Sequence, residues 1–186
     1  IPSSYRPVLG GLQTVVHDLA RRLMAAGHQA WVLTNRFPRS LPAQEILDGV
    51  PVQRCLFLSP SMDHLKRGRL DLFLAACYHC PRTFIRLCHL MRTFRPEIIN
   101  VHFPSSQIPF VLGLRLFFHF RLVVSLHGSD VEGEDVRRGR LLLMLRSADS
   151  VTACSGYLLG VAARMDPMLS KKGTVIYNGV DLDLFE

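Results

Sequence analysis

The chain has few acidic residues for its size. It holds 15 Asp and Glu against 22 Lys and Arg, which gives a formal net charge of +7 over 186 residues. This balance favours anionic partners such as phosphate groups, phospholipid surfaces or nucleic acid, without choosing among them. Because no aromatic platform or nucleic-acid recognition motif accompanies the charge, we expect no nucleic-acid partner. Hydrophobic residues make up 48% of the chain, as in a folded domain.

The cysteines lack a disulfide pattern. The five Cys are an odd number without the spacing of a disulfide framework, which indicates a reducing, cytoplasmic compartment. Cys77, Cys80 and Cys88 with His89 have the residue types of a metal site. However, positions 77, 80, 84 and 88 would fall on one face of a helical stretch, where small apolar thiols pack. We therefore expect packing here and no bound metal.

The sequence shows no signal peptide and no uninterrupted membrane span. Arg115, His119 and Arg121 interrupt its most apolar stretch, residues 108–126, which favours a helix followed by a buried strand. The chain begins at Ile1 and stops at Glu186 without a tail, so we expect it to be cut from a longer protein at both ends.

Several catalytic motifs are missing. No Gly-Lys-Ser/Thr follows the glycines at 10 and 11, so there is no Walker A loop, and there is no Gly-x-Gly-x-x-Gly fingerprint. Gly-x-Ser-x-Gly and His-Glu-x-x-His are absent, which excludes the common serine hydrolases and zincins. A hydrolase with paired carboxylates needs a second acid cluster facing Asp130, Glu132 and Glu134, and we find none.

What the sequence does contain is an alternation of helical and extended patterns. Apolar residues recur at i, i+3, i+4, i+7 and i+11 from Leu12 to Leu23, which predicts a helix over residues 11–26 that ends at Gly27. Further helices are predicted at 81–94, 108–118, 138–147 and 156–165. Strands are predicted at 29–34, 50–55, 97–102, 121–126, 150–154 and 174–177. We expect loops at 35–49 and 56–75.

This alternation predicts a Rossmann-like α/β fold, a parallel sheet with helices on both faces. The first helix follows a glycine loop and precedes a strand, so the first strand of the fold would precede Ile1. In such sheets ligands bind beyond the carboxyl ends of the strands. The segments at those ends form one expected rim: residues 8–11, 102–106, 127–130, 154–156 and 178–181.

Three features of this sequence allow two interpretations. Gly10 and Gly11 either turn the chain into the helix or let a phosphate approach the backbone N–H groups at its start. His127 either caps a turn or points into a cleft, with Asp130 close by. Between residues 64 and 95, seven Lys and Arg face one acid, Asp71. That stretch is either a solvated face or a surface for an anionic membrane or a phosphorylated acceptor.

Five segments in chain order carry a family resemblance. They are GGLQ (10–13) with AGH (26–28), PEIINVH (96–102), SLHGSD (125–130), ADSVTACS (148–155), and VIYNGVD (175–181) with Phe185. Together they resemble GT-B glycosyltransferases of the glycosyltransferase family 4 type. Gln13 and His127 are similar to those of phosphatidylinositol mannosyltransferases.

The resemblance implies a role for each matching residue. Gly10 and Gly11 would bind the donor diphosphate, and His127 would be the catalytic residue that hydrogen-bonds the donor sugar. Six further residues would line the cleft or lie near the acceptor: Gln13, His102, Gly128, Asp130, Ser155 and Asn178. It also implies a nucleotide-sugar co-substrate, retention of configuration, no metal or other cofactor, and a lipid or cell-envelope glycan acceptor. The protein would act at the cytoplasmic face of a membrane, as a peripheral protein.

The same resemblance implies a domain organisation. Residues 1–177 would be the acceptor-side N-terminal domain, and residues 178–186 would cross into an absent C-terminal domain that binds the donor. The 186 residues alone should then be inactive and marginally stable. Two other interpretations remain, namely a sugar-nucleotide epimerase of the same fold and a binding module that has lost its chemistry.

Overall fold

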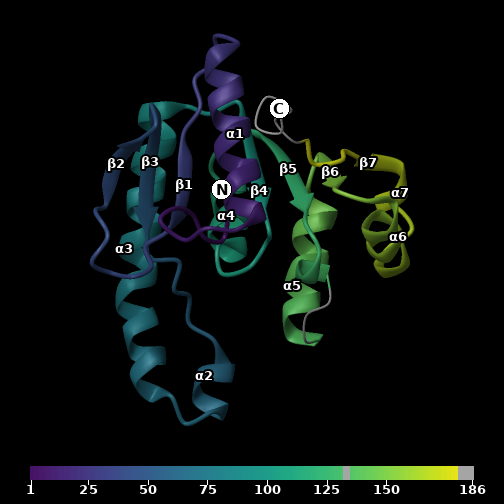
Figure 1. Ribbon diagram of the computed structural model, residues 1–186. Coiled ribbons are helices and arrows are strands. Elements are labelled where there is room, and N and C mark those ends of the chain that lie inside the picture. The colour runs from purple at the N-terminus through teal and green to yellow at the C-terminus, as the bar shows by residue number, and fades with distance from the viewer. Residues whose placement is uncertain (132–134, 180–186) are drawn as a thin grey trace.

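A computed structural model describes residues 1–131 and 135–179 as an α/β fold with two sheets (Figure 1). In the first, of order β1-β3-β2, β1 (Val32–Asn35) is parallel to β3 (Val50–Cys55), and β2 (Gln44–Leu47) is antiparallel to β3. The second sheet has four parallel strands in chain order. These are β4 (Ile98–His102), β5 (Arg121–Leu126), β6 (Ser150–Ala153) and β7 (Gly173–Val175).

Helices lie on both faces of the strands, which confirms the predicted fold class. They are α1 (Gly11–Ala25), α2 (Met62–Lys66), α3 (Leu70–Phe94), α4 (Ile108–Arg115), α5 (Asp135–Ser147), α6 (Gly156–Met165) and α7 (Leu169–Lys172), with a 3₁₀ turn η1 (Ser129–Val131). Right-handed connections between successive parallel strands put α3 to α6 on one face. In Figure 1, α1 crosses in front of the strands and α3 lies behind them.

The first two residues lie between the two sheets. Pro2 forms an isolated parallel bridge with His102 at the end of β4, and the His102 N–H donates to the Ile1 carbonyl at 3.0 Å. On the other side, the Thr34 hydroxyl of β1 donates to the Pro2 carbonyl at 3.4 Å. Residues 1–2 therefore join β1 to β4 at the place where the predicted first strand would lie. That strand stays a prediction.

The first helix ends as the sequence predicts. Gly27 has a φ of +87°, a left-handed conformation that favours glycine. Its N–H donates to the Met24 carbonyl, and the His28 N–H donates to the Leu23 carbonyl, both at 3.0 Å. This pair of hydrogen bonds is a Schellman motif, which satisfies the last free carbonyls of α1 and turns the chain toward β1.

The two faces of the four-stranded sheet differ. One face packs against α3, α4 and α5 through fully buried apolar side chains, among them Val101, Leu122, Val124, Leu126 and Val151. The other face is polar. There the Thr152 hydroxyl donates to the Ser125 hydroxyl at 2.8 Å, which donates in turn to the Asn100 amide oxygen at 2.9 Å. The core thus holds the strands together from one side and leaves polar groups along the other.

Two segments that we expected to be loops contain regular structure. Residues 44–47 form β2, which pairs with β3 through a two-residue turn in which Asp48 and Gly49 both have positive φ, 48° and 82°. Asp-Gly is a favoured sequence for this tight hairpin turn, so the signal was present. Residues 56–75 contain α2 and the start of α3.

The third helix is longer than predicted. We expected it to begin at Pro81, but α3 begins at Leu70 and contains Pro81 in its interior. Apolar residues lie on its outer as well as its inner face over residues 70–80, and this hides the helical period. Cys80 and Cys88 pack against the core as expected, whereas the prediction for Cys77 was wrong, because its side chain is exposed.

Candidate functional site

The predicted site residues follow the carboxyl ends of parallel strands. His102 ends β4, His127 follows β5, Ser155 follows β6 and Asn178 follows β7. Because β4 to β7 are parallel and paired in order, these four positions lie along one edge of the sheet. Residues 1–2 pair beside β4, so the glycine loop that leads into α1 starts at the same edge.

A pair of histidines connects the ends of β4 and β5 at this rim. His102 Nδ1 and His127 Nε2 lie 3.0 Å apart, which is hydrogen-bond distance. Burial is the main cause that lowers the pKa of both imidazoles, and it places that of His102 well below its usual range. Both rings are therefore neutral at neutral pH, and one nitrogen of the pair carries the proton that the other accepts.

Within the described residues, one ring nitrogen of His127 has no hydrogen-bond partner. Its Nε2 is engaged by His102, so Nδ1 is the atom left for a ligand. When His102 Nδ1 carries the shared proton, neutral His127 has its own proton on Nδ1 and can donate a hydrogen bond there. His127 is half-buried, whereas His102 is fully buried. The outer imidazole is thus the one that can meet a ligand, and the inner one fixes its tautomer.

Asp130 shapes the loop after β5. Its carboxylate accepts hydrogen bonds from the backbone N–H of Gly128 at 2.8 Å and of His127 at 3.1 Å. Burial raises the pKa of this carboxyl group, while the backbone hydrogen bonds act in the opposite direction. Gly128 has a φ of +146°, a conformation that L side chains rarely adopt. Asp130 therefore contacts the His127 backbone, with no described contact to its ring.

The two glycines differ in what surrounds them. A Cβ atom on Gly10 would lie 2.6 Å from the Gln13 side-chain oxygen, whereas one on Gly11 would meet nothing within 4 Å. No side chain caps the start of α1, and its first turn has no acidic residue. The N-terminal N–H groups of α1 thus adjoin open space, which is the arrangement that suits an anion.

Gln13 is turned toward the glycine loop. It is buried, and its amide nitrogen donates to the Ser4 hydroxyl at 2.6 Å, while its oxygen lies over Gly10. The structure does not bring Gln13 into contact with the histidine pair. It connects α1 to the chain segment that precedes it.

A polar network behind the glycine loop, partly buried, was not predicted. The Tyr5 hydroxyl lies 2.6 Å from His17 Nδ1, and Asp48 Oδ2 lies 3.2 Å from His17 Nε2. Asp48 also pairs with Arg6 at 2.6 Å. Fully buried Arg54 donates to the Arg6 carbonyl at 2.6 Å and pairs with Glu45. The network ties the segment before Gly10 to α1 and to the β2–β3 hairpin.

The protonation states within this network follow from burial. Burial raises the pKa of Tyr5 to about 12, so the phenol keeps its proton and donates to His17 Nδ1. Burial, followed by the charge of Arg6, lowers the pKa of His17, although Asp48 opposes this shift. His17 is therefore neutral, and its Nε2 lies 3.2 Å from the Asp48 carboxylate without forming a hydrogen bond among the described residues. In the sequence, the Asp48-Gly49 turn was the one signal that could have predicted the hairpin to which this network binds.

Ser155 and Asn178 lie on the rim but apart from the histidine pair. The Ser155 hydroxyl caps α6 by accepting from the Leu158 N–H at 3.3 Å. Asn178 follows β7 and is exposed. Cys154, one residue before Ser155, connects the strand ends, since its thiol lies 3.7 Å from the His127 carbonyl. Residues 180–181 and 185 of the last motif fall outside the described residues, as do Glu132 and Glu134.

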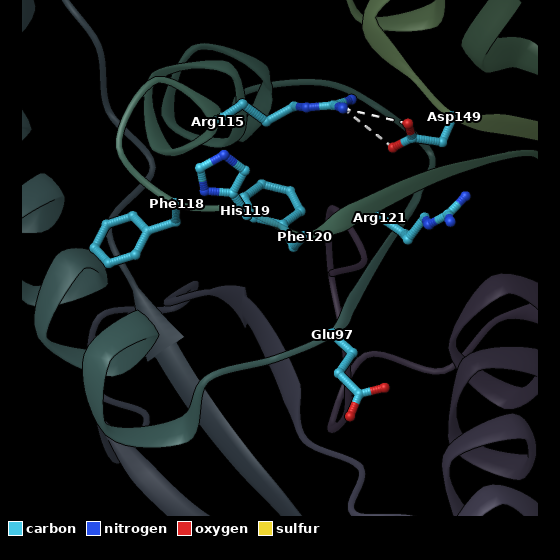
Figure 2. Close-up of a pocket in the computed structure, with 7 residues that line it drawn as sticks. All are labelled: Glu97, Arg115, Phe118, His119, Phe120, Arg121 and Asp149. Carbon is cyan, nitrogen blue, oxygen red and sulfur yellow. Dashed lines mark hydrogen bonds and ion pairs between the residues drawn. The ribbon is translucent and has the colours of Figure 1, made fainter.

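A pocket among the described residues lies at the opposite edge of the sheet. It has a volume of about 440 Å³, and its lining residues are Glu97, Arg115, Phe118, His119, Phe120, Arg121 and Asp149 (Figure 2). These residues precede or begin β4, β5 and β6. Arg115 is engaged by Asp149 at 3.1 Å, as the dashed lines in Figure 2 show. Ligands of such sheets bind at the carboxyl edge, so we do not assign the site to this pocket.

No metal site is formed by the part of the chain that the structure describes. Within residues 1–131 and 135–179, no three His, Cys, Asp or Glu side chains gather as metal ligands would. Nor is any described helix long and apolar enough to cross a membrane.

Comparisons with known proteins agree with this geometry. The model of the family described as Glycosyltransferase Family 4 matches residues 9–184. No curated protein matches the chain. A solved chain of sucrose-phosphate synthase (tll1590) from Thermosynechococcus elongatus is similar in structure, with a TM-score of 0.59 and 17% sequence identity. The match covers 100% of this chain and 93% of that one, and at this identity it shows the fold alone.

Proposed function

This chain belongs to glycosyltransferase family 4, and from that membership we propose that it is the acceptor-side domain of a retaining glycosyltransferase. Membership implies a nucleotide-sugar donor. The acceptor that we propose is a lipid or a cell-envelope glycan. The observation that carries the proposal is the match over residues 9–184, which includes both histidines and both glycines of the rim.

The proposed domain organisation follows the family pattern. Residues 1–177 form the N-terminal domain, and residues 178–186 lead into a second domain that binds most of the donor. Catalysis then requires closure of the two domains, which excludes water and completes the site. We expect the 186 residues alone to transfer no sugar. The five cysteines, all free, support a cytoplasmic location.

Gly10 and Gly11 are the proposed seat of the donor diphosphate. The uncapped N–H groups at the start of α1 supply hydrogen-bond donors and the positive end of the helix dipole. The open space beside Gly11 gives the diphosphate room to approach the backbone. No metal is needed in this scheme, since backbone donors here and cationic groups of the second domain offset the charge.

His127 is the proposed catalytic residue. Its Nδ1 donates a hydrogen bond to the donor sugar near the reacting carbon, which orients the sugar and stabilises charge in the transition state. His102 is a positioning residue, since it reaches the substrate only through His127. Five other residues line or shape the cleft in this scheme, namely Gln13, Gly128, Asp130, Ser155 and Asn178. Among these five, Asn178 is the exposed one.

The described residues add no support to the other two interpretations. An epimerase would use acids at the strand ends, and of these the Asp130 carboxylate accepts hydrogen bonds from backbone N–H groups, while Glu132 and Glu134 lie outside the described residues. A binding module would bind the donor without forming a product, which the assay below distinguishes.

The proposal is tested by assaying the full-length protein with a panel of nucleotide-sugars and a membrane extract as acceptor. We expect transfer from one donor class, with a product whose anomeric configuration, read by NMR, matches that of the donor. An epimerised nucleotide-sugar, or tight donor binding without any product, would contradict the proposal.

A further inference from the structure

The surface of the first half of α3 is the feature that the proposed function does not use. The Thr83 hydroxyl donates to the Leu56 carbonyl at 2.9 Å, so the middle of α3 lies level with the end of β3. The 13 residues of α3 before Thr83 therefore extend about 20 Å beyond the carboxyl edge of the sheet. Figure 1 shows α2 and this part of α3 projecting past the strand ends.

An apolar stripe runs along the outer face of this helix. Its members, Leu70, Leu74, Cys77, Tyr78, Pro81 and Ile85, are spaced at i, i+4, i+7, i+8, i+11 and i+15, and all are exposed. Leu70, Leu74, Tyr78 and Ile85 expose 56%, 58%, 56% and 69% of their surface. The buried residues Ala76, Thr83, Leu87 and Met91 lie on the other face. This α3 stripe is thus a second apolar face that the described residues leave uncovered.

Basic side chains border the α3 stripe. Arg82 lies over the Tyr78 ring, with its guanidinium carbon 3.6 Å from the ring centroid. Lys66 and Arg86 carry further positive charge, and the one acid between residues 64 and 95, Asp71, pairs with Arg69 at 2.9 Å. Aliphatic stems of Arg and Lys can cover apolar surface while their charged ends stay in water.

We propose that the α3 stripe inserts into the interface of an anionic phospholipid bilayer. An exposed apolar face with a basic border is the surface of a helix that lies in the plane of a membrane. The apolar side chains enter the boundary between headgroups and acyl chains, and the basic ones bind lipid phosphates. An acidic protein partner would offer carboxylates to these basic side chains, but no feature of the described surface favours carboxylates over lipid phosphates. The net charge of +7 favours binding to an extended anionic surface such as a bilayer.

The position of the stripe adds a consequence for the reaction. It lies at the same edge of the sheet as His127 and the glycine loop, so docking would bring the rim close to the bilayer surface. A lipid acceptor could then reach the site with its acyl chains still in the membrane. This last step rests on the proposed function, whereas the binding to lipid does not.

The test is flotation of the full-length protein with vesicles of phosphatidylcholine alone or mixed with phosphatidylglycerol. We expect binding to the mixed vesicles that high salt weakens and does not abolish, because insertion persists when charges are screened. The double variant Leu70→Glu/Leu74→Glu should bind more than about tenfold less. The control Leu116→Glu changes a leucine at the opposite edge that is even more exposed, and it should bind as the unmodified protein does.

Three results would overturn the inference: no binding to mixed vesicles, equal binding by the double variant, or a dimer in sedimentation that the double variant abolishes. The last would show that a second copy covers the stripe. Because all three leucines are exposed, melting temperatures should agree among the proteins, and Leu74→Ser is the milder variant if they do not. Transfer to a water-soluble acceptor should be unchanged in the double variant, which separates this inference from the proposed function.

Discussion

At the scale of single residues, a substitution at Gly11 can test donor binding without disturbing the fold. A side chain there meets nothing in the structure, whereas one on Gly10 would collide with Gln13. We predict that Gly11→Val leaves the melting temperature unchanged within a few degrees and weakens binding of the donor diphosphate, since the added methyls occupy its seat. Calorimetric titration of the full-length protein with the nucleotide diphosphate measures this. Unchanged affinity would show that the glycine serves the chain alone.

His102 acts on the reaction through one hydrogen bond. We predict that His102→Ala lowers kcat about tenfold or more and changes the KM for the donor little, because His127 loses the partner that fixes its tautomer. His102→Asn, whose amide can occupy the place of Nδ1, should restore part of the rate.

The pH profile distinguishes this role from simple packing. Burial lowers the pKa of His127, and removal of the His102 ring opens the inner side of this imidazole to water, so its pKa should move back toward its usual value. The acidic limb of kcat/KM should then shift to higher pH in His102→Ala. If the profile and kcat stay the same, His102 is a structural residue only.

At the scale of elements, the segment before α1 is held by its hydrogen bonds to neighbouring elements. We predict that Tyr5→Phe lowers the free energy of unfolding by about 1–3 kcal/mol, because it leaves His17 Nδ1 buried without a partner. Urea unfolding measures the loss. Since Tyr5 is itself buried, phenylalanine preserves the packing and isolates the hydroxyl. The double variant Tyr5→Phe/His17→Leu should recover stability if the loss comes from the unpaired nitrogen.

The sequence predicts elements best where one face is apolar. The helix over residues 11–26 and the strands at 50–55 and 121–126 are confirmed almost to the residue, since periodicity, Gly27 and β-branched runs agree there. The first half of α3 was missed because both of its faces carry apolar residues. β2 was missed because its side chains are alternately exposed and half-buried, which gives little hydrophobic pattern.

The site was predictable in position and less so in contacts. Loops that follow parallel strands lie at the same edge of the sheet, so the sequence predicted that His102 and His127 lie on one rim. No motif encodes side-chain rotamers. The sequence therefore could not predict which nitrogen of His127 faces His102, or that the Asp130 carboxylate accepts from the backbone. The Tyr5–His17–Asp48 contacts join segments up to 43 residues apart in the sequence, beyond the reach of local patterns.

At the scale of the whole molecule, three histidines are held neutral by burial. The pKa values of His17, His102 and His127 are all lowered, so the unfolded chain binds protons that the folded chain does not. Stability is therefore full above the unfolded pKa of about 6.5 and falls as the pH drops below it. Each histidine contributes at most about 1.4 kcal/mol per pH unit.

We thus predict a lower free energy of unfolding at pH 5.5 than at pH 7.5 (about one unit either side of the unfolded pKa), measured by urea titration of the full-length protein. His17→Gln should reduce this pH dependence. A constant free energy of unfolding across this range would contradict the neutral, buried histidines.

The account as a whole depends on one claim, that the carboxyl-edge rim with His127 is the reacting part of a family 4 glycosyltransferase. The most direct measurement is the turnover of the full-length enzyme with His127→Ala, compared with His119→Ala, whose exposed imidazole lies in the pocket at the opposite edge. We predict that His127→Ala loses about 10²–10³ in kcat while the protein stays folded, and that His119→Ala retains full turnover. Full turnover by His127→Ala, or equal losses in both variants, would contradict the claim.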